Sequence, residues 1–247
     1  MLDSRRVLEI ATALLLATAA AGCATTQATT TTQYNGAVPR PSLILVYRFA
    51  TSAGDIQLDR SPTAVAQWKL QGLSSSQERH DVADAVSKAM RDKLVAKIVA
   101  MGLNAQYGEG PPSLVDGPVV VIDGQFVAID EGSRALRLTI GLGAGRSNVR
   151  TNVQVVELYP EGRRILEQFE VDAKSGRKPG AAETMGVGAA AGTVATAAAV
   201  TAATAVGSEA FGADVDADAE RTATKVAKLL AVYFAEQGWI PPQTSGL

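Results

Sequence analysis

Few residues in this chain could do chemistry, because it has one cysteine, Cys23, and one histidine, His80. A Ser-His-Asp triad would have to use His80, which stands beside Asp81 at the start of an expected helix, and the G-x-S-x-G signature of serine hydrolases is missing. A zinc site would have to be completed by carboxylates. We interpret His80 as a solvated histidine on a helix surface, and we expect no catalytic residue, metal or cofactor.

Three carboxylates, Asp123, Asp130 and Glu131, form a small acidic cluster in the sequence. Two carboxylates held several ångströms apart around a sugar can hydrolyse a glycoside, and carboxylate oxygens also bind calcium. However, Asp130-Glu131-Gly132 stands where a hairpin turn is needed, and acidic residues are common in turns. We prefer the turn interpretation and keep a carboxylate-based hydrolase as the alternative.

The glycine-rich stretch 141–146, GLGAGR, has the composition of a phosphate-binding loop. Such a loop needs a helix directly after it, so that backbone N–H groups point at the phosphate. A strand is expected there instead, so we interpret the stretch as a flexible or bulged connection between strands. Arg146 and Arg150 beside it could still bind an anionic group, such as a lipid or glycan phosphate.

A basic corner with Arg177 and Lys178 precedes a Gly/Ala-rich insert at residues 184–213. Cations beside an apolar segment can contact anionic head groups. Within the insert, Gly186, Gly188 and Gly192 offer small faces that let helices approach closely. Three interpretations stay open for it: a membrane-inserting or oligomerising glycine-zipper hairpin, a tightly packed helix pair, or a flexible excursion.

Cys23 follows a segment with the features of a secretory signal peptide at residues 1–22. Arg5 and Arg6 precede a mostly apolar stretch that is too short to span a bilayer stably. Ala20-Ala21-Gly22-Cys23 resembles the lipobox of bacterial lipoproteins, with alanine where leucine is usual. That resemblance implies cleavage before Cys23, lipid on its sulfur and, with Ala24 next, sorting to the outer membrane facing the periplasm or the cell surface.

Composition sets further limits on the mature chain. The net charge of −2 gives no sign of the basic patch that a nucleic-acid partner requires. Residues 23–38 are almost free of large apolar side chains, so we expect the lipidated cysteine and a flexible tether there. Residues 39–247 are long enough for a single domain with a real core.

Hydrophobic periodicity predicts the early elements of this domain. An apolar run at 42–49 is typical of a strand buried on both faces, and residues 51–73 have the mixed composition of a long loop. Apolar residues at every fourth position after 75 predict a helix. We expect a capping box from Ser75 and Glu78 and a stop at Gly102.

Four strands are then expected at 119–129, 134–142, 148–159 and 163–172, followed by a helix at about 216–237. Between 148 and 159, Val149 and Val153 share one face while Arg150 and Asn152 share the other, which predicts one packed and one solvated face. The order β-α-β-β-β-β-insert-α predicts an α+β fold with a mostly antiparallel sheet of about five strands and helices on one face.

The chain resembles the bacterial domain-of-unknown-function family numbered 4410, found mainly on predicted lipoproteins. The motifs that carry the resemblance are Gly124-Gln125-Phe126, Ile129 to Gly132, Ile140 to Gly145, Val153-Gln154-Val155, Ser175 to Gly180 and Gln237 to Ile240. The element order is also similar in outline to curli-export and penicillin-binding-protein-activator lipoproteins. The first family has no assigned activity, so the resemblance implies no reaction.

We therefore expect a membrane-anchored envelope lipoprotein with a non-enzymatic binding or assembly role. Its expected partners are the membrane, through the lipid, and another envelope protein or further copies of itself. The alternative is an envelope hydrolase that acts on glycan or lipid through carboxylates such as Asp130 and Glu131.

Overall fold

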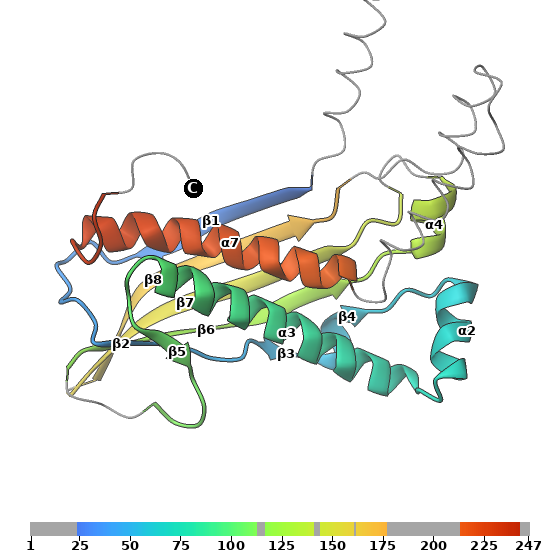
Figure 1. Cartoon of the computed structure of the whole chain (residues 1–247), viewed down its shortest axis with the longest axis horizontal. Helices are drawn as coiled ribbons and strands as arrows, with labels where there is room; N and C mark the ends of the chain where they lie inside the picture. Colours follow the sequence, from blue (N-terminus) through green and yellow to red (C-terminus); the bar gives the residue numbers. More distant parts are fainter. Residues whose placement is uncertain (1–23, 113–116, 141–143, 161, 177–212, 243–247) are drawn as a thin grey trace, which may run out of the picture.

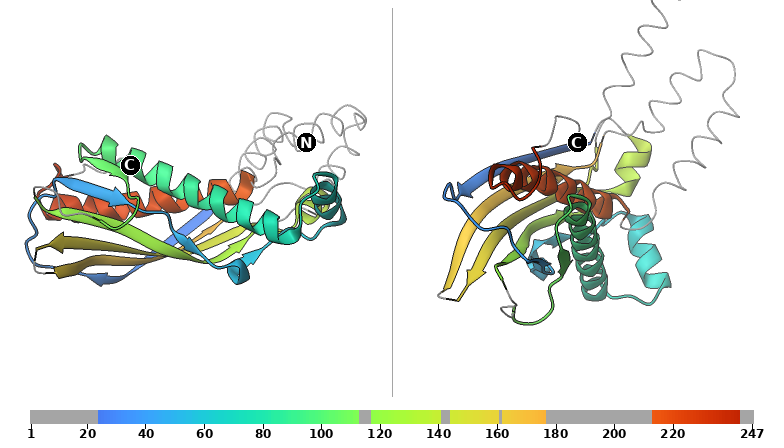
Figure 2. Two further views of the ribbon diagram at one scale, coloured as in Figure 1. Left: turned by 90° about the horizontal axis from the view of Figure 1, so that it is seen from below. Right: turned by 60° about the vertical axis from the view of Figure 1, so that its left-hand side comes forward.

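The computed structural model describes residues 24–112, 117–140, 144–160, 162–176 and 213–242. A long twisted sheet forms its centre, with two helices along one face (Figures 1 and 2). The predicted signal peptide, Cys23, Arg177, Lys178 and the three glycines of the insert lie outside the described residues. Within the described part, no helix is both long and apolar enough to cross a bilayer.

One half of the sheet is antiparallel and runs in the order β1–β8–β7–β6. Its strands are β6 (Val119–Asp130), β7 (Asn148–Tyr159), β8 (Gly162–Lys174) and β1 (Thr25–Gln33). β7 and β8 form an antiparallel hairpin, with Tyr159 opposite Gly162. The strands predicted at 119–129, 148–159 and 163–172 are therefore confirmed, with small shifts at their ends.

The other half is parallel, which corrects the expectation of a mostly antiparallel sheet of about five strands. β2 (Leu43–Val46) pairs in parallel with both β6 and β5 (Ala105–Tyr107). Two short strands, β3 (Ala50–Thr51) and β4 (Ile56–Gln57), also run parallel to β6. The described residues thus form a mixed eight-stranded sheet within an α+β fold. Parallel neighbours need a long crossover connection, which α3 provides between β2 and β5.

Two long helices, α3 (Ser75–Ala100) and α7 (Ala213–Glu236), lie side by side on the same face of the sheet (Figure 2). Both were predicted from their apolar periodicity. The cap of α3 is one residue earlier than expected: Ser74 and Gln77 form the capping box. Glu78, which was expected in that role, is buried with 3% of its surface exposed.

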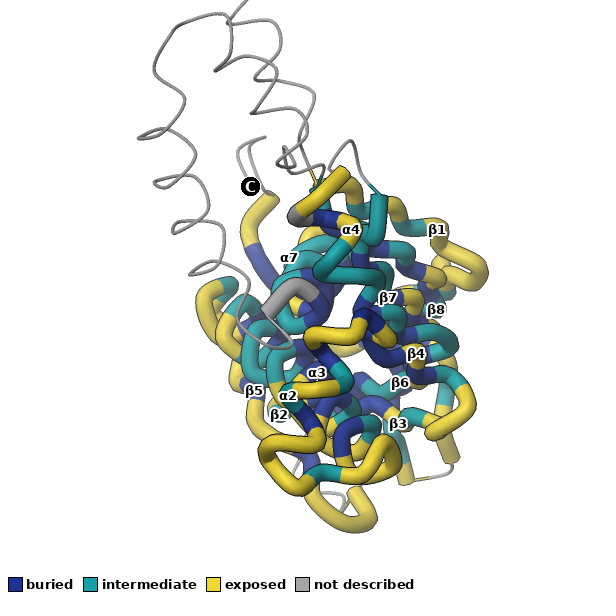
Figure 3. Tube along the Cα trace, turned by 90° about the vertical axis from the view of Figure 1, so that its right-hand side faces the viewer, coloured by how far each residue is buried: buried dark blue, intermediate teal, exposed yellow. Residues whose placement is uncertain are grey.

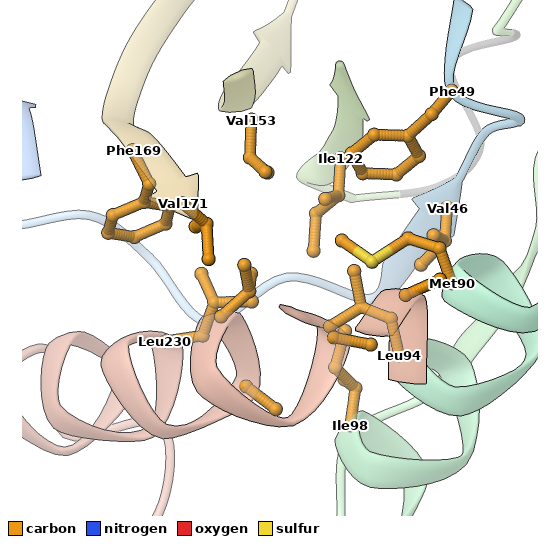
Figure 4. Close-up of a cluster of buried hydrophobic side chains, with 14 of the residues drawn as sticks. Val46, Phe49, Met90, Leu94, Ile98, Ile122, Val153, Phe169, Val171 and Leu230 are labelled. Atoms are coloured by element: carbon orange, nitrogen blue, oxygen red, sulfur yellow. The ribbon is translucent and has the colours of Figure 1, made fainter. Parts of the chain in front are cut away.

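The core lies between these helices and the sheet (Figure 4). From the helices come Met90, Leu94 and Leu230, each fully buried. They meet Ile122 of β6 and Phe169 of β8. In β2, Ile44 and Val46 are buried, whereas Leu43 and Leu45 are only half-buried, so the prediction of a strand buried on both faces is wrong. This strand alternates because the helices cover only one side of the sheet.

The long loop expected at 51–73 is instead structured. It contains β3, a short 3-10 turn, η2 (Ala53–Asp55), β4 and the helix α2 (Pro62–Leu70). Ser61 caps α2 by accepting a hydrogen bond from the Ala64 backbone N–H, and Pro62 occupies the first turn, where its missing N–H costs nothing.

The strand expected at 134–142 is the helix α4 (Arg134–Thr139). Ser133 caps it by accepting a hydrogen bond from the Leu136 N–H. The Arg137 guanidinium binds the carbonyl oxygens of Glu131 and Gly145, at 2.8 and 2.6 Å. These contacts favour a helical turn, so Asp130-Glu131-Gly132 leads into a helix rather than closing a hairpin.

The flexible tether expected at 23–38 also needs correction, because Thr25–Gln33 form β1 along the edge of the sheet. β1 pairs with β8 from Thr25 opposite Lys174 to Gln33 opposite Glu167. Beyond it, the Tyr34 N–H donates to the Leu166 carbonyl at 2.7 Å.

The long strands give the sheet two distinct ends. At one end, a continuous row of cross-strand neighbours joins Thr25, Lys174, Asn148, Asp130 and Gln57. We call this the α4 end, onto which Figure 3 looks. The opposite end, where the chain after α7 folds back with Trp239, is the Trp239 end.

Candidate functional site

The sheet face opposite the helices carries the polar residues of the alternating strands. In β7, Val149 and Val153 are buried under the helices, whereas Arg150 and Asn152 are exposed on the open face. The predicted split into a packed and a solvated face is therefore confirmed.

The strand register sets these polar residues in rows. One row joins Asp123, Gln154 and Gln168, and the next joins Gln125, Asn152 and Glu170. Neighbouring strands lie about 4.8 Å apart, so each row places three hydrogen-bonding side chains within about 10 Å. The rows form a continuous polar strip across three strands.

This strip is hollowed into a groove, which we call the sheet groove. Its larger part has a volume of about 650 Å³ and is bounded by Thr31, Tyr47, Arg48, Asp123, Gln125, Asn152, Gln154, Gln168 and Glu170. A second part of about 430 Å³ shares Asn152 and Glu170 with the first and continues past Arg150 and Asp172 towards the α4 end. The groove thus follows the strands for much of their length.

Two polar atoms in the larger part of the sheet groove are buried without a hydrogen-bond partner among the described residues: Tyr47 Oη and Asp123 Oδ1. Burial, followed by the negative charge of Asp123, raises the pKa of the Tyr47 hydroxyl. An unsatisfied buried polar atom costs about 1–3 kcal/mol, and a ligand that bonded to it would recover part of that cost.

Two glycines allow the backbone around the groove to take its shape. A Cβ on Gly124 would lie 2.2 Å from the Asn152 carbonyl oxygen and 2.6 Å from the Phe49 ring. A Cβ on Gly108 would lie 2.5 Å from the Tyr47 ring. Gly124 therefore lets Phe49 pack behind β6, and Gly108 leaves room for the Tyr47 ring that borders the groove.

A separate hollow of about 570 Å³ lies at the α4 end, and we call it the arginine pocket. It is lined by Gln57, Leu58, Arg60, Ser61, Asp130, Gly132, Ser133, Leu136, Gly145 and Arg146. Neither the Arg60 nor the Arg146 side chain forms a hydrogen bond or ion pair with any described residue. Asp130, the one carboxylate among these lining residues, accepts a hydrogen bond from the Gly132 N–H at 2.8 Å.

The floor of the arginine pocket depends on two glycines with left-handed backbone. Gly132 and Gly145 both have φ of +68°. A Cβ on Gly132 would lie 2.2 Å from the Gly145 carbonyl oxygen, and one on Gly145 would lie 2.3 Å from the Ser133 carbonyl oxygen. The glycines of the GLGAGR and Asp-Glu-Gly stretches thus let two backbone segments touch. Residues 141–143 of the former lie outside the described residues.

The carboxylates of the hydrolase alternative have separate surroundings. Asp123 lines the sheet groove and Asp130 the arginine pocket. Glu131 is buried and accepts a hydrogen bond from the Asp59 N–H at 2.9 Å, and burial is the main cause that raises its pKa. Sequence proximity therefore did not produce a shared site for these three groups.

Sequence reasoning missed a buried polar network that ties α7 to the sheet at the α4 end. The Ser147 hydroxyl donates to Asp218 Oδ2 at 2.6 Å, and Asp218 also binds Arg221 of the next turn. The Ser147 N–H donates to the Ser175 hydroxyl at 3.0 Å. The signal for it was Asp218, a charged residue within the apolar periodicity of a predicted helix.

His80 and Arg150 lie apart from the arginine pocket. His80 is exposed on α3 and its Nδ1 lies 3.7 Å from Asp84 Oδ2, as expected of a solvated histidine. Arg150 lines the sheet groove rather than sharing the arginine pocket with Arg146. The described ranges contain no group of three or more metal-ligating side chains.

Comparison with solved structures finds similar but distant proteins. A PelC dodecamer from Paraburkholderia phytofirmans is 11% identical, with 87% of this chain and 96% of that chain covered and a TM-score of 0.33. A second structure of that dodecamer is 12% identical, with 79% of this chain and 98% of that chain covered and a TM-score of 0.32. A Xanthomonas campestris protein of the DUF330 family is 12% identical, with 84% of this chain and 94% of that chain covered and a TM-score of 0.33. TM-scores this low transfer neither assembly nor function to this chain.

No curated protein matches the chain. A family model does match residues 44–192, from the start of the parallel strands to beyond β8. The matched range contains the motifs around Gly124, Asp130, Gly145 and Gln154, although the predicted motif at 237–240 lies outside it. Because this range is more than half of the sequence, the chain belongs to the DUF4410 family of domains of unknown function.

Proposed function

We propose that this protein is a bacterial envelope lipoprotein, acylated on Cys23, that binds a polar envelope component non-covalently in its sheet groove. The lipobox-like residues before Cys23 support the anchor, and Ala24 supports an outer-membrane address. A role in binding rather than catalysis is supported by the dispersal of Asp123, Asp130 and Glu131 over different surroundings.

The sheet groove is the observation that carries the binding role. Its amide side chains both donate and accept hydrogen bonds, and Tyr47 and Asp123 offer polar atoms without partners among the described residues. Such a surface matches a ligand rich in hydroxyl or amide groups. The ligand is another envelope component or a further copy of this chain, because the anchor would confine the groove to the membrane surface.

Photo-cross-linking in cells tests this proposal. A photoreactive residue replaces Gln125, which is exposed in the groove, and in a matched variant it replaces Val232, which is 57% exposed on α7. We expect a discrete cross-linked product from position 125 and none from position 232. Equal labelling at both positions, or none at position 125, would contradict a groove-specific ligand.

Acylation is tested separately by feeding cells an alkyne-labelled fatty acid. The full chain should incorporate the label, and Cys23→Ala should abolish incorporation and leave the signal peptide uncleaved. Retained labelling in Cys23→Ala would rule out this anchor.

A further inference from the structure

The beginning of β1 determines how closely a lipid on Cys23 would hold the domain. β1 starts at Thr25, so Ala24 alone separates Cys23 from the sheet. Two residue steps span at most about 7 Å. Given the acylation proposed above, on which this inference rests, the α4 end of the sheet must lie within about 10 Å of the lipid.

The arginine pocket opens at this same end. Thr25 and Gln57 belong to one cross-strand row, and Gln57 lines the pocket. They are separated by four strand spacings, or roughly 19 Å. A membrane surface that meets the end of β1 is therefore broad enough to meet the pocket residues Arg60 and Arg146 as well.

The two arginines differ from several other basic residues of the described surface. Arg48 pairs with Asp84, Lys93 with Glu220 and Lys174 with Asp172. Arg60 and Arg146 have no such partner within the described residues. Against their two positive charges, the pocket lining has one carboxylate, Asp130, so the pocket carries a net positive charge.

Apolar side chains flank these cations. Leu136 lines the arginine pocket and is 42% exposed, and Ile140, just after α4, is 48% exposed. Cations beside exposed aliphatic groups match the boundary between phosphate head groups and acyl chains.

We propose that the α4 end lies directly on the membrane surface and that Arg60 and Arg146 bind anionic lipid head groups in the arginine pocket. Leu136 and Ile140 then contact the upper acyl region. The domain lies against the membrane without a spacer, and the sheet groove extends away from it along the strands.

Hydrogen–deuterium exchange of the acylated full chain tests this proposal on vesicles of phosphatidylcholine with or without phosphatidylglycerol. We expect the α4 amides to exchange at least about fivefold more slowly on the anionic vesicles, which is roughly the contribution of one cation at such a surface. Arg60→Gln combined with Arg146→Gln should abolish that difference. The matched variant Arg150→Gln removes an exposed charge from the sheet groove. It should retain the difference in α4 exchange between the two kinds of vesicle.

Equal α4 exchange on both vesicles, or loss of the difference in Arg150→Gln, would overturn the proposal. Glycerol phosphate added without vesicles distinguishes a soluble ligand: full protection of α4 by it would also overturn a lipid-surface role. Fatty-acid labelling of the same sample separates the two proposals. Labelled protein without a vesicle effect contradicts the surface contact alone, whereas unlabelled protein contradicts the anchor.

Discussion

The two ends of the sheet are closed in different ways. At the Trp239 end, the indole stacks on Phe234 with ring centroids 5.0 Å apart and donates a 2.9 Å hydrogen bond to the Val38 carbonyl. The Gln237 amide accepts from the Val38 N–H and donates to the Gly36 carbonyl. At this end, the Trp239 indole and the Gln237 amide thus find their hydrogen-bond partners within the chain.

The α4 end is held by backbone contacts and polar groups instead. Gly132 and Gly145 touch through their backbones, and Ser147 binds Asp218 beneath them. These contacts fix the shape of the arginine pocket but neutralise neither Arg60 nor Arg146. The two ends therefore differ: side-chain contacts close the Trp239 end, whereas the two arginines at the α4 end have no partner among the described residues.

Trp239→Ala should have the largest effect, because it opens the closed end. We expect a loss of about 3–5 kcal/mol in the free energy of unfolding, as for other buried aromatic residues, measured by urea denaturation. Val232→Ala, at an exposed site on α7, is the control and should change stability by less than about 0.5 kcal/mol. A Trp239→Ala cost below 1 kcal/mol would show that this end is not held as described.

Gly132→Ala breaks the backbone contact at the α4 end. Its control is Gly110→Ala, since Gly110 has nearly the same φ, +66°, but nothing within 4 Å of the added Cβ. We expect Gly110→Ala to cost about 1 kcal/mol from backbone strain and Gly132→Ala to cost about 1–2 kcal/mol more. Equal losses in urea denaturation would show that the close approach to Gly145 does not constrain this end.

The ends should also respond differently to pH. Burial, then the charge of Glu236, raises the pKa of Glu167 near the Trp239 end to about 8. Burial, then Glu131 and Asp81, raises the pKa of Glu78 near the α4 end to about 7. Both carboxyl groups are easier to protonate in the folded state than in the unfolded state. Their protonation therefore stabilises the fold, and this contribution to the free energy of unfolding is fully present below the ordinary pKa of 4.5. It is lost as pH rises through 7 and then 8.

Glu167→Gln should therefore increase the free energy of unfolding at pH 9 by roughly 1–3 kcal/mol relative to the unmodified chain. Glu78→Gln should remove only the part of the stability loss that occurs as pH rises towards 7. Glu170→Gln, which replaces an exposed carboxylate of the same strand, is the matched control for the substitution itself. Identical pH profiles for Glu167→Gln and the unmodified chain would refute this description of the Trp239 end.

Arg60→Gln combined with Arg146→Gln should have the smallest effect on stability. Because neither side chain has a partner among the described residues, we expect a change of less than about 0.5 kcal/mol in urea denaturation. A loss above 1 kcal/mol would mean that the arginines hold the α4 end together, and the comparison between the ends would fail.

Periodicity predicted the parts of the fold that face the core. Val149 and Val153 alternate as a half-buried strand requires, and α3 and α7 carry apolar stripes. The same reasoning failed at α4, where Leu136, Leu138 and Ile140 alternate like a strand. Arg137 contacts the carbonyl oxygens of Glu131 and Gly145, six and eight residues away along the chain, and these contacts favour a helix there.

Non-local pairing explains the other failures. The Thr-rich β1 has no apolar face to reveal it, although threonine favours strands, and its order comes from β8. Parallel pairing of β2 with both β5 and β6 cannot be read from local composition. The polar face of the groove was predictable from alternation, but the meeting of Arg60 with Arg146 depends on α2, α4 and β4 being brought together.

We propose that the α4 end rests on the membrane, and spin labels measure this contact directly. If Cys23 carries lipid, a cysteine introduced elsewhere is the only free thiol, so a spin label can be placed by Leu136→Cys at the α4 end or Asn35→Cys at the Trp239 end. On vesicles with nickel-chelating lipids, we predict strong paramagnetic broadening at position 136 and little at position 35. β7 separates the two ends by roughly 35–40 Å. Equal broadening at both positions would contradict the claim.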